Sequence, residues 1–255
     1  MNEAVKYHND LNLVKFNNFN PIELDIFFAV CQQMRLKNLS EITLSFEKLR
    51  ELTNYTSTSR ERFITDINST YRKLLETTMP IITKSKIIRF VLFTKYEIDL
   101  INDKVTIKTN KEFEYILNII NGNFTRFELE EFVNIRRANS KTIYKHLKQF
   151  RSTGIWRVDY DEFLVIIGMS DEKIKSTDKT KEINRILKDL APLFRGLNLE
   201  KVKKGNKATG KIQKLIWRFQ AEKQHEIERV ILDTKEQSNT FHEYHDHPNQ
   251  AKLEF

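Results

Sequence analysis

Basic and hydroxyl side chains gather on a helix that the sequence predicts at residues 178–190 and on the segment just before it. Apolar residues recur along one side of this helix, and basic residues lie on the opposite side. Arg and Lys can donate hydrogen bonds to guanine O6 and N7, whereas Ser and Thr hydroxyls suit phosphate oxygens. The spacing therefore predicts a DNA-contacting surface formed by Lys175, Ser176, Thr177, Asp178, Lys179, Lys181, Arg185 and Lys188.

A similar set lies on an earlier helix, whose start is predicted by a capping box of Thr58 and Glu61. Phe63 and Ile67 belong to its buried stripe. The outward residues are Thr58, Arg62, Thr65, Ser69 and Arg72. A later hairpin, with strands predicted at 197–202 and 212–219, has a basic tip made of Lys203, Lys204 and Lys207.

A charged helix face is commonly only a solvated surface, and this is the alternative interpretation for any one of these side chains. DNA contact is favoured because the basic residues, the helix order and the lysine-rich hairpin tip coincide. Residues 171–223 contain 15 basic and 7 acidic side chains, whereas 224–255 contain 3 basic and 7 acidic ones. Asp178 would repel phosphate but can accept a hydrogen bond from cytosine N4, which favours a sequence-specific interaction.

No motif typical of an enzyme accompanies these surfaces. The sequence has no G-x-x-x-x-G-K-[ST] loop for ATP, and the single cysteine, Cys31, cannot form a disulfide or a thiolate metal site within the chain. Segment 242–247 (HEYHDH) has metal-ligand residue types, but a nickase needs two His flanking an apolar residue, and Asp246 takes that place. We therefore expect no catalysis, no cofactor and no bound metal.

The chain has 255 residues, with 43 Lys and Arg against 35 Asp and Glu and a net charge of +8. This length suits two domains of ordinary size, and the positive charge favours a polyanionic partner. No apolar segment approaches the ~20 residues that span a bilayer, and the first residues have no apolar signal core. We therefore expect a cytoplasmic protein without membrane contact.

The two halves of the sequence repeat one order of elements: a short helix, a longer helix and a hairpin. Segment 45–49 (SFEKL) matches 159–163 (DYDEF), because each has a cap, an aromatic, an acid, a charged and an apolar residue. Alignment of Phe63 and Ile67 with Ile183 and Leu187 extends the match into the longer helix. Two capped helical hairpins can also look alike by chance. As a true repeat, the order is that of a winged helix-turn-helix.

We therefore predict an α+β protein with two tandem winged helix-turn-helix domains, at residues 1–122 and 123–220, and an acidic tail at 221–255. In the first domain, Asn20 and Glu23 should cap a core helix. In the second, Thr125 and Glu128 should open a helix. A further helix, opened by Ser140, should turn four basic side chains toward solvent: Lys141, Lys145, Lys148 and Arg151.

The sequence resembles iteron-binding replication initiators of theta-replicating plasmids from low-GC Gram-positive bacteria over about residues 5–219. The similar segments are 20–27 (NPIELDIF), 49–53 (LRELT), 142–154 (TIYKHLKQFRSTG) and 196–205 (GLNLEKVKKG). The resemblance implies recognition helices at 58–75 and 178–190 that enter the major grooves of direct repeats in double-stranded DNA. It also implies local duplex opening and recruitment of the host replicative helicase or its loader. A homodimer, formed through the first domain and in equilibrium with the monomer, would repress the protein's own gene.

Two other functions would use similar residues. A winged-helix transcriptional regulator without initiator activity would share both folds, and only replication of a plasmid carrying the gene and its flanking repeats distinguishes the two. A relaxase or nickase would instead cut supercoiled DNA with Mn²⁺ or Mg²⁺ and form a DNA–tyrosine adduct.

Overall fold

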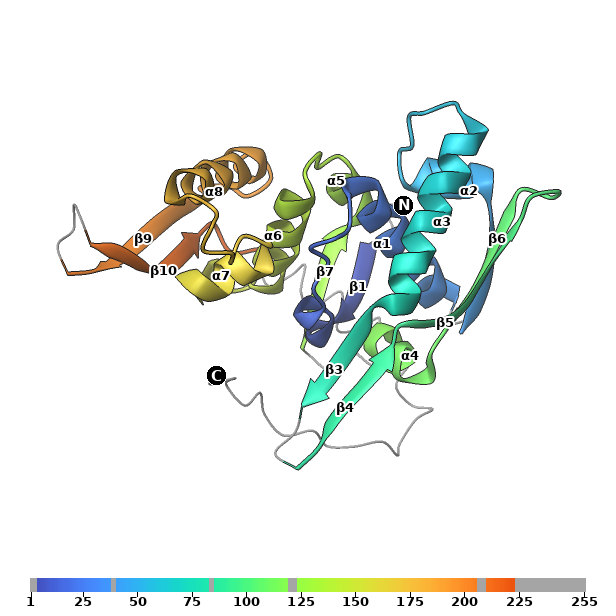
Figure 1. Ribbon diagram of the computed structural model, residues 1–255, viewed down its shortest axis with the longest axis horizontal. Helices are drawn as coiled ribbons and strands as arrows, with labels where there is room; N and C mark the ends of the chain where they lie inside the picture. The colour runs from blue at the N-terminus through green and yellow to red at the C-terminus, as the bar shows by residue number, and fades with distance from the viewer. Residues whose placement is uncertain (1–3, 38–39, 83–84, 119–122, 206–209, 223–255) are drawn as a thin grey trace.

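The computed structural model describes residues 4–37, 40–82, 85–118, 123–205 and 210–222. Figure 1 shows an elongated molecule in which one group of helices and strands lies at each end, with further elements between them. The two groups contain the same kinds of element in the same order along the chain.

The first winged-helix unit is a three-stranded antiparallel sheet with helices packed against it. Its elements, with the helix that precedes them, are α1 (Pro21–Lys37), β2 (Glu41–Ser45), α2 (Phe46–Leu52), α3 (Arg60–Glu76), β5 (Phe93–Asp99) and β6 (Lys104–Thr109). The strands pair in the order β2-β6-β5. Asn20 N donates to Glu23 Oε2 (2.7 Å) and Glu23 N donates to Asn20 Oδ1 (3.0 Å), which confirms the predicted cap of α1.

The second winged-helix unit repeats this layout. Its elements, again with the preceding helix, are α6 (Ala138–Gln149), β8 (Ile155–Asp159), α7 (Tyr160–Ile166), α8 (Ser176–Leu190), β9 (Asn198–Lys204) and β10 (Lys211–Arg218). The strands pair in the order β8-β10-β9, so in both units the last strand lies between the other two. The structure thus confirms the predicted α+β fold with two tandem winged helix-turn-helix units.

Two antiparallel ribbons and three short helices complete the described chain. Strand β1 (Ala4–His8) pairs with β7 (Phe124–Glu128), and β3 (Thr78–Ile82) pairs with β4 (Ile87–Val91). The short helices are a 3-10 helix (Asn9–Leu13), α4 (Lys111–Asn118) and α5 (Leu129–Val133). The β1–β7 ribbon joins the start of the chain to a strand beyond residue 122, and the domain division placed there stays a prediction.

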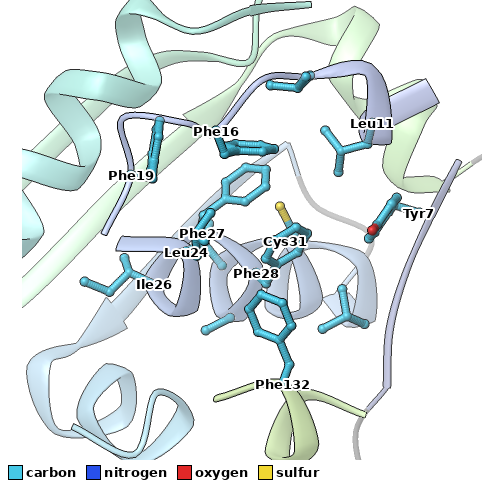
Figure 2. Close-up of a cluster of buried hydrophobic side chains, with 14 of the residues drawn as sticks. Tyr7, Leu11, Phe16, Phe19, Leu24, Ile26, Phe27, Phe28, Cys31 and Phe132 are labelled. Carbon is cyan, nitrogen blue, oxygen red and sulfur yellow. The ribbon is translucent and has the colours of Figure 1, made fainter. Parts of the chain in front are cut away.

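Buried aromatic rings connect the two halves of the molecule. Figure 2 shows Phe27 and Phe28 of α1 among Tyr7, Phe16 and Phe132. The centroid of Phe28 lies 5.7 Å from that of Tyr7 and 5.0 Å from that of Phe132, which belongs to α5. All five rings are buried. Helix α1 therefore lies in the interior of the molecule and contacts elements from both halves.

Helix α6 contradicts the sequence prediction. It begins at Ala138, two residues before Ser140, and it contacts α1 as well as α8. Lys141 is 0% exposed and Lys145 is 1% exposed. The remaining predicted outward residues, Lys148 and Arg151, keep only 12% and 8% of their side-chain surface. The prediction of an outward basic face on this helix is wrong, because α6 packs against α1, α8 and β7, and Lys148 and Arg151 both pair with Glu222.

Each buried ammonium of α6 has a specific environment. Lys141 Nζ donates to Asp25 Oδ1 (2.5 Å) and to the backbone oxygen of Phe132 (2.7 Å). Lys145 Nζ lies over the ring of Phe16, 4.7 Å from its centroid. Burial lowers the pKa of Lys145 to about 7, because the charged form loses its hydration.

The predicted start of α3 is also wrong. Ser59, not Thr58, is the cap residue: its Oγ accepts a hydrogen bond from Arg62 N (3.1 Å), and the helix begins at Arg60. Thr58 precedes the cap and is exposed. Both hydroxyl residues precede Glu61, so the local sequence did not distinguish them.

The helix predicted from Thr125 and Glu128 is a strand. Both residues lie in β7, and Thr125 Oγ1 donates to Asn9 Oδ1 (2.8 Å). The residues of β7 pair with β1, a segment more than a hundred positions earlier. This long-range pairing overrides the local capping pattern, and α5 begins only at Leu129.

Candidate nucleic-acid interface

Helix α8 presents most of the residues predicted to contact DNA. It begins at Ser176, two residues before the predicted start, and ends at Leu190 as predicted. Ile183, Ile186 and Leu190 are buried, whereas Lys179 is half-buried. The other members of the predicted set are exposed: Lys175, Ser176, Thr177, Asp178, Lys181, Arg185 and Lys188.

Two acidic side chains of α8 are held against the start of α6. Asp189 Oδ2 accepts a hydrogen bond from Ser140 Oγ (2.6 Å), and Glu182 Oε1 accepts one from Asn139 Nδ2 (2.9 Å). Asp178, at the beginning of the helix, is exposed. The solvent-facing side of α8 beyond its first turn is consequently cationic.

Helix α3 presents a smaller cationic face. Exposed members of its predicted set are Arg62, Thr65 and Arg72 on the helix and Thr58 before it. Ser69 is half-buried, and its hydroxyl donates to Glu23 Oε1 (2.7 Å). Ser69 therefore lies at the edge of the outward face, beside α1.

Both units have a hydrogen bond between a hydroxyl and a carboxylate that joins the long helix to the preceding helix, but donor and acceptor lie on opposite helices in the two units. Ser69 of α3 donates to Glu23, the third residue of α1. The alignment of the two long helices places Asp189 opposite Ser69, and Asp189 accepts from Ser140, the third residue of α6. The hydroxyl and the carboxylate have exchanged helices while the hydrogen bond persists. This equivalence favours a true repeat over a chance likeness of capped helices.

A basic side chain completes each of these pairs. Lys73 Nζ lies 2.6 Å from Glu23 Oε2, and Arg137 Nη1 lies 2.6 Å from Asp189 Oδ1. Lys73 belongs to α3, whereas Arg137 precedes α6, so the cation has also changed helices. Both units thus attach their long helix to the preceding helix through a charged, hydrogen-bonded contact at an equivalent place.

The hairpins that follow the two long helices end in different residue types. At the end of β9, Lys203 is half-buried and Lys204 is exposed, and Lys207 lies outside the described residues. The turn between β5 and β6 carries exposed Leu100 and Ile101. Two successive apolar residues at a turn were the signal that could have revealed the apolar tip.

Arg60, the first residue of α3, was not predicted to have a role. Its Nη2 donates to the backbone oxygen of Leu100 (2.6 Å) and to Asp103 Oδ1 (2.6 Å). The contact attaches the hairpin turn to the beginning of the helix. No local pattern could indicate it, because the partners lie 40 and 43 positions away.

Other kinds of site find no support in the part of the chain that the structure describes. No group of three or more His, Cys, Asp and Glu residues there could hold a metal ion. The segment 242–247 lies outside the described residues. None of the described helices is both long and apolar enough to span a membrane.

The fold and the two exposed helices define a tandem winged-helix protein. Residues 4–148 match the family described as "Initiator Replication protein, WH1". The chain is 32% identical over 248 residues to the "Probable replication protein rep" of Bifidobacterium longum (strain NCC 2705), and the match covers 94% of this chain and 80% of that protein. The chain therefore belongs to the initiator replication protein family, which confirms the resemblance to plasmid replication initiators.

The fold is also similar to that of a solved initiator. The Pi initiator protein, solved in complex with iteron DNA, matches with a TM-score of 0.62 and 13% sequence identity. The match covers 87% of this chain and 98% of that chain. The likeness thus extends over both winged-helix units.

Proposed function

We propose that this protein initiates plasmid replication by binding direct repeats of origin DNA sequence-specifically through α8 and α3. The main supporting observation is the solvent-facing side of α8, where cations are exposed while Glu182 and Asp189 are held against α6. A helix of this kind suits the major groove. Membership of the initiator family and the likeness to a protein solved with iteron DNA support the same ligand.

Within this surface we assign different tasks to different residues. Arg185 and Lys181 are exposed on α8, and we assign them to the reading of base edges. Residues at the helix start, Lys175, Ser176 and Thr177, suit phosphate oxygens together with the free backbone amides there. Lys203 and Lys204 of the second hairpin suit the DNA backbone. The proposed contacts of the first unit are Thr58, which precedes α3, and Arg62, Thr65, Ser69 and Arg72 on α3.

The free energy of DNA binding would then open the origin, and no covalent bond of the DNA would be made or broken. Two helices on one chain can meet successive major grooves roughly 10 bp apart on one face of a duplex. Tandem occupancy of the repeats would bend the DNA and strain a neighbouring AT-rich segment, whose steps deform easily. The host replicative helicase or its loader would enter through contact with the bound protein in the cytoplasm.

We further assign dimerisation to residues 1–122 and the main repeat recognition to residues 123–220. Strand β4 of the first region exposes Ile87 (70%) and Ile88 (44%), and exposed neighbouring apolar residues favour a protein contact. A homodimer made through this region, in equilibrium with the monomer, would repress the protein's own gene. The acidic tail, residues 221–255, is given no task.

Binding measurements on three variants test the DNA assignment. Arg185→Ala should weaken binding to cognate repeats by roughly 1–3 kcal/mol and change binding to random duplex little, because it removes a base contact. Lys204→Ala should weaken binding to cognate and random duplex equally, and it should reduce the slope of log K against log salt concentration by about one. Lys111→Ala, an exposed lysine on α4, is the matched control and should change neither. An equal loss on cognate and random DNA for Arg185→Ala would contradict the base-reading role.

A replication assay tests the initiator function itself. A plasmid with this gene and its flanking repeats as the sole origin should replicate in a naive host, and Arg185→Ala should abolish or strongly reduce this. Repeat binding without replication would identify a transcriptional regulator. Supercoiled plasmid incubated with the protein and Mn²⁺ or Mg²⁺ should stay uncut, and a covalent DNA–tyrosine adduct would overturn the proposal in favour of a nickase.

A further inference from the structure

The tip of the first hairpin exposes large apolar side chains. Ile101 is 94% exposed, the highest fraction among the large apolar residues that the structure describes, and its neighbour Leu100 is 54% exposed. Single exposed apolar residues are ordinary on protein surfaces. Here two successive ones occupy the turn of the β5–β6 hairpin, which Figure 1 shows at the outer edge of the molecule, and strand β5 of this hairpin packs against α3, the helix proposed to contact DNA.

The turn has a defined structure. Asp99 Oδ1 accepts hydrogen bonds from the backbone amides of Ile101 (3.0 Å) and Asn102 (2.9 Å), and Asn102 Nδ2 donates to Asp99 Oδ2 (2.7 Å). Asp103 adopts a left-handed backbone conformation with φ of 50°, as tight hairpin turns require. These hydrogen bonds fix the backbone of the turn, from which the side chain of Ile101 extends into solvent.

The same turn is attached to the two helices of the helix-turn-helix. Arg60, at the start of α3, donates to Leu100 O and to Asp103 Oδ1, both at 2.6 Å. Phe46 N, at the start of α2, donates to the backbone oxygen of Asp103 (2.8 Å). Any duplex that receives α3 therefore meets the turn in a fixed position.

A shallow hollow lies between the hairpin and the outward face of α3. It has a volume of about 300 Å³ and is lined by Ile64, Thr65 and Asn68 of α3, by Ile98 of β5 and by Leu100 of the turn. Thr65 belongs to the proposed DNA-contacting set. With α3 in a major groove, the hairpin tip would thus reach the adjacent backbone and minor groove.

We propose that Ile101 inserts as an apolar wedge between base pairs, from the minor groove beside the site of α3, and kinks the repeat DNA. Apolar side chains used in this way unstack a base step and bend the duplex away from the protein. Exposed Lys104 follows the turn and can neutralise a phosphate beside it, whereas the guanidinium of Arg60 is paired with Asp103. Strand β9 of the second hairpin ends in Lys203 and Lys204. The first hairpin would therefore unstack bases, and the second would contact the DNA backbone. This inference rests on the proposed function.

The test uses the full-length chain and a duplex selected from random sequence by the wild-type protein. 2-Aminopurine is placed at successive positions of the duplex, and the bend is measured by fluorescence transfer between the duplex ends. Wild-type protein should raise the 2-aminopurine fluorescence at one step and kink the duplex by about 20–90°. Ile101→Ala should abolish the fluorescence rise and reduce the bend while it still binds the duplex, and Ile101→Leu should retain both. Leu13→Ala, at a 53% exposed leucine on the 3-10 helix, is the matched control and should behave as wild type.

Each contrary result has a distinct meaning. An unchanged fluorescence rise and bend for Ile101→Ala overturns the wedge and leaves the proposed function in place. A loss of self-association in sedimentation, with unaltered bending, overturns it in favour of a protein contact at Ile101. Failure of the wild-type protein to enrich any duplex sequence overturns the proposed function and the wedge together.

Discussion

Replacing Asp25 with Ala should destabilise the protein by about 3 kcal/mol, because it leaves a buried ammonium without its partner. Lys141 Nζ lies 2.5 Å from Asp25 Oδ1, and the two side chains are 0% and 3% exposed. Breaking such a pair from one side costs about 3–5 kcal/mol. Lys141 would keep its bond to the oxygen of Phe132 and its position 4.5 Å from the centroid of that ring, so we expect the lower end of this range.

Urea unfolding at neutral pH, followed by circular dichroism, provides the measurement. The double variant Asp25→Leu with Lys141→Met should recover most of the loss, since well-packed apolar side chains replace buried ion pairs at little or no cost. Glu97→Ala is the control: it breaks the pair between Lys95 and Glu97, both more than half exposed, and should cost less than about 1 kcal/mol.

Two outcomes would refute this reasoning. A loss below about 1 kcal/mol for Asp25→Ala would mean that water or another acceptor reaches the ammonium, contrary to its burial. A double variant as unstable as the single one would mean that the lost packing of Asp25, and not the unpaired charge of Lys141, causes the effect.

Three further predictions test other features of the fold. Burial lowers the folded-state pKa of Lys145 to about 7, whereas the pKa in the unfolded chain is near 10.5. Between these two pH values the unfolded chain binds more protons than the folded one, so the free energy of unfolding rises with pH. Lys145→Met should remove this pH dependence in unfolding curves at pH 7 and 9, and should stabilise the protein at pH 7 by up to about 5 kcal/mol. Gly154→Ala should cost more than about 1 kcal/mol in the melting curve, because Gly154 has a φ of 66° and a Cβ there would collide with the backbone oxygen of Phe219. Ser59→Ala should lower the free energy of unfolding by about 0.5–2 kcal/mol, and Thr58→Ala should leave it nearly unchanged, because Ser59 and not Thr58 caps α3. A larger loss for Thr58→Ala than for Ser59→Ala would contradict the assigned cap.

The long helices of both units could be predicted because their burial is one-sided. Phe63 and Ile67 on α3, and Ile183 and Leu190 on α8, recur at the helical period, and the opposite side of each helix remains polar. An amphipathic helix shows its orientation in the local sequence. The exposed faces of α3 and α8 were therefore predictable before the structure, apart from the half-buried Ser69 and Lys179.

The role of α6 could not be predicted, because its basic residues resemble an ordinary solvated face. What decides their burial is Asp25, which lies 116 positions from Lys141, together with the aromatic rings around Lys145. The same limit applies to β7, where Thr125 is a strand residue only because β1 pairs with it. Local patterns indicate the period of an element, whereas pairing with a distant segment determines which side of it is covered.

The buried contact between α1 and α6 also bears on the proposed interface. Helix α1 contacts α3, α6 contacts α8, and α1 and α6 contact each other. Ser69 joins α3 to Glu23 of α1, and Ser140 of α6 joins Asp189 of α8, so each long helix is attached to one side of this contact. A fixed crossing of α1 and α6 therefore fixes α3 and α8 relative to each other. If both helices enter one duplex, as we propose, these buried residues set the distance between the two major-groove segments that α3 and α8 can bind together. The surface side chains then read only the bases that this distance brings within their reach.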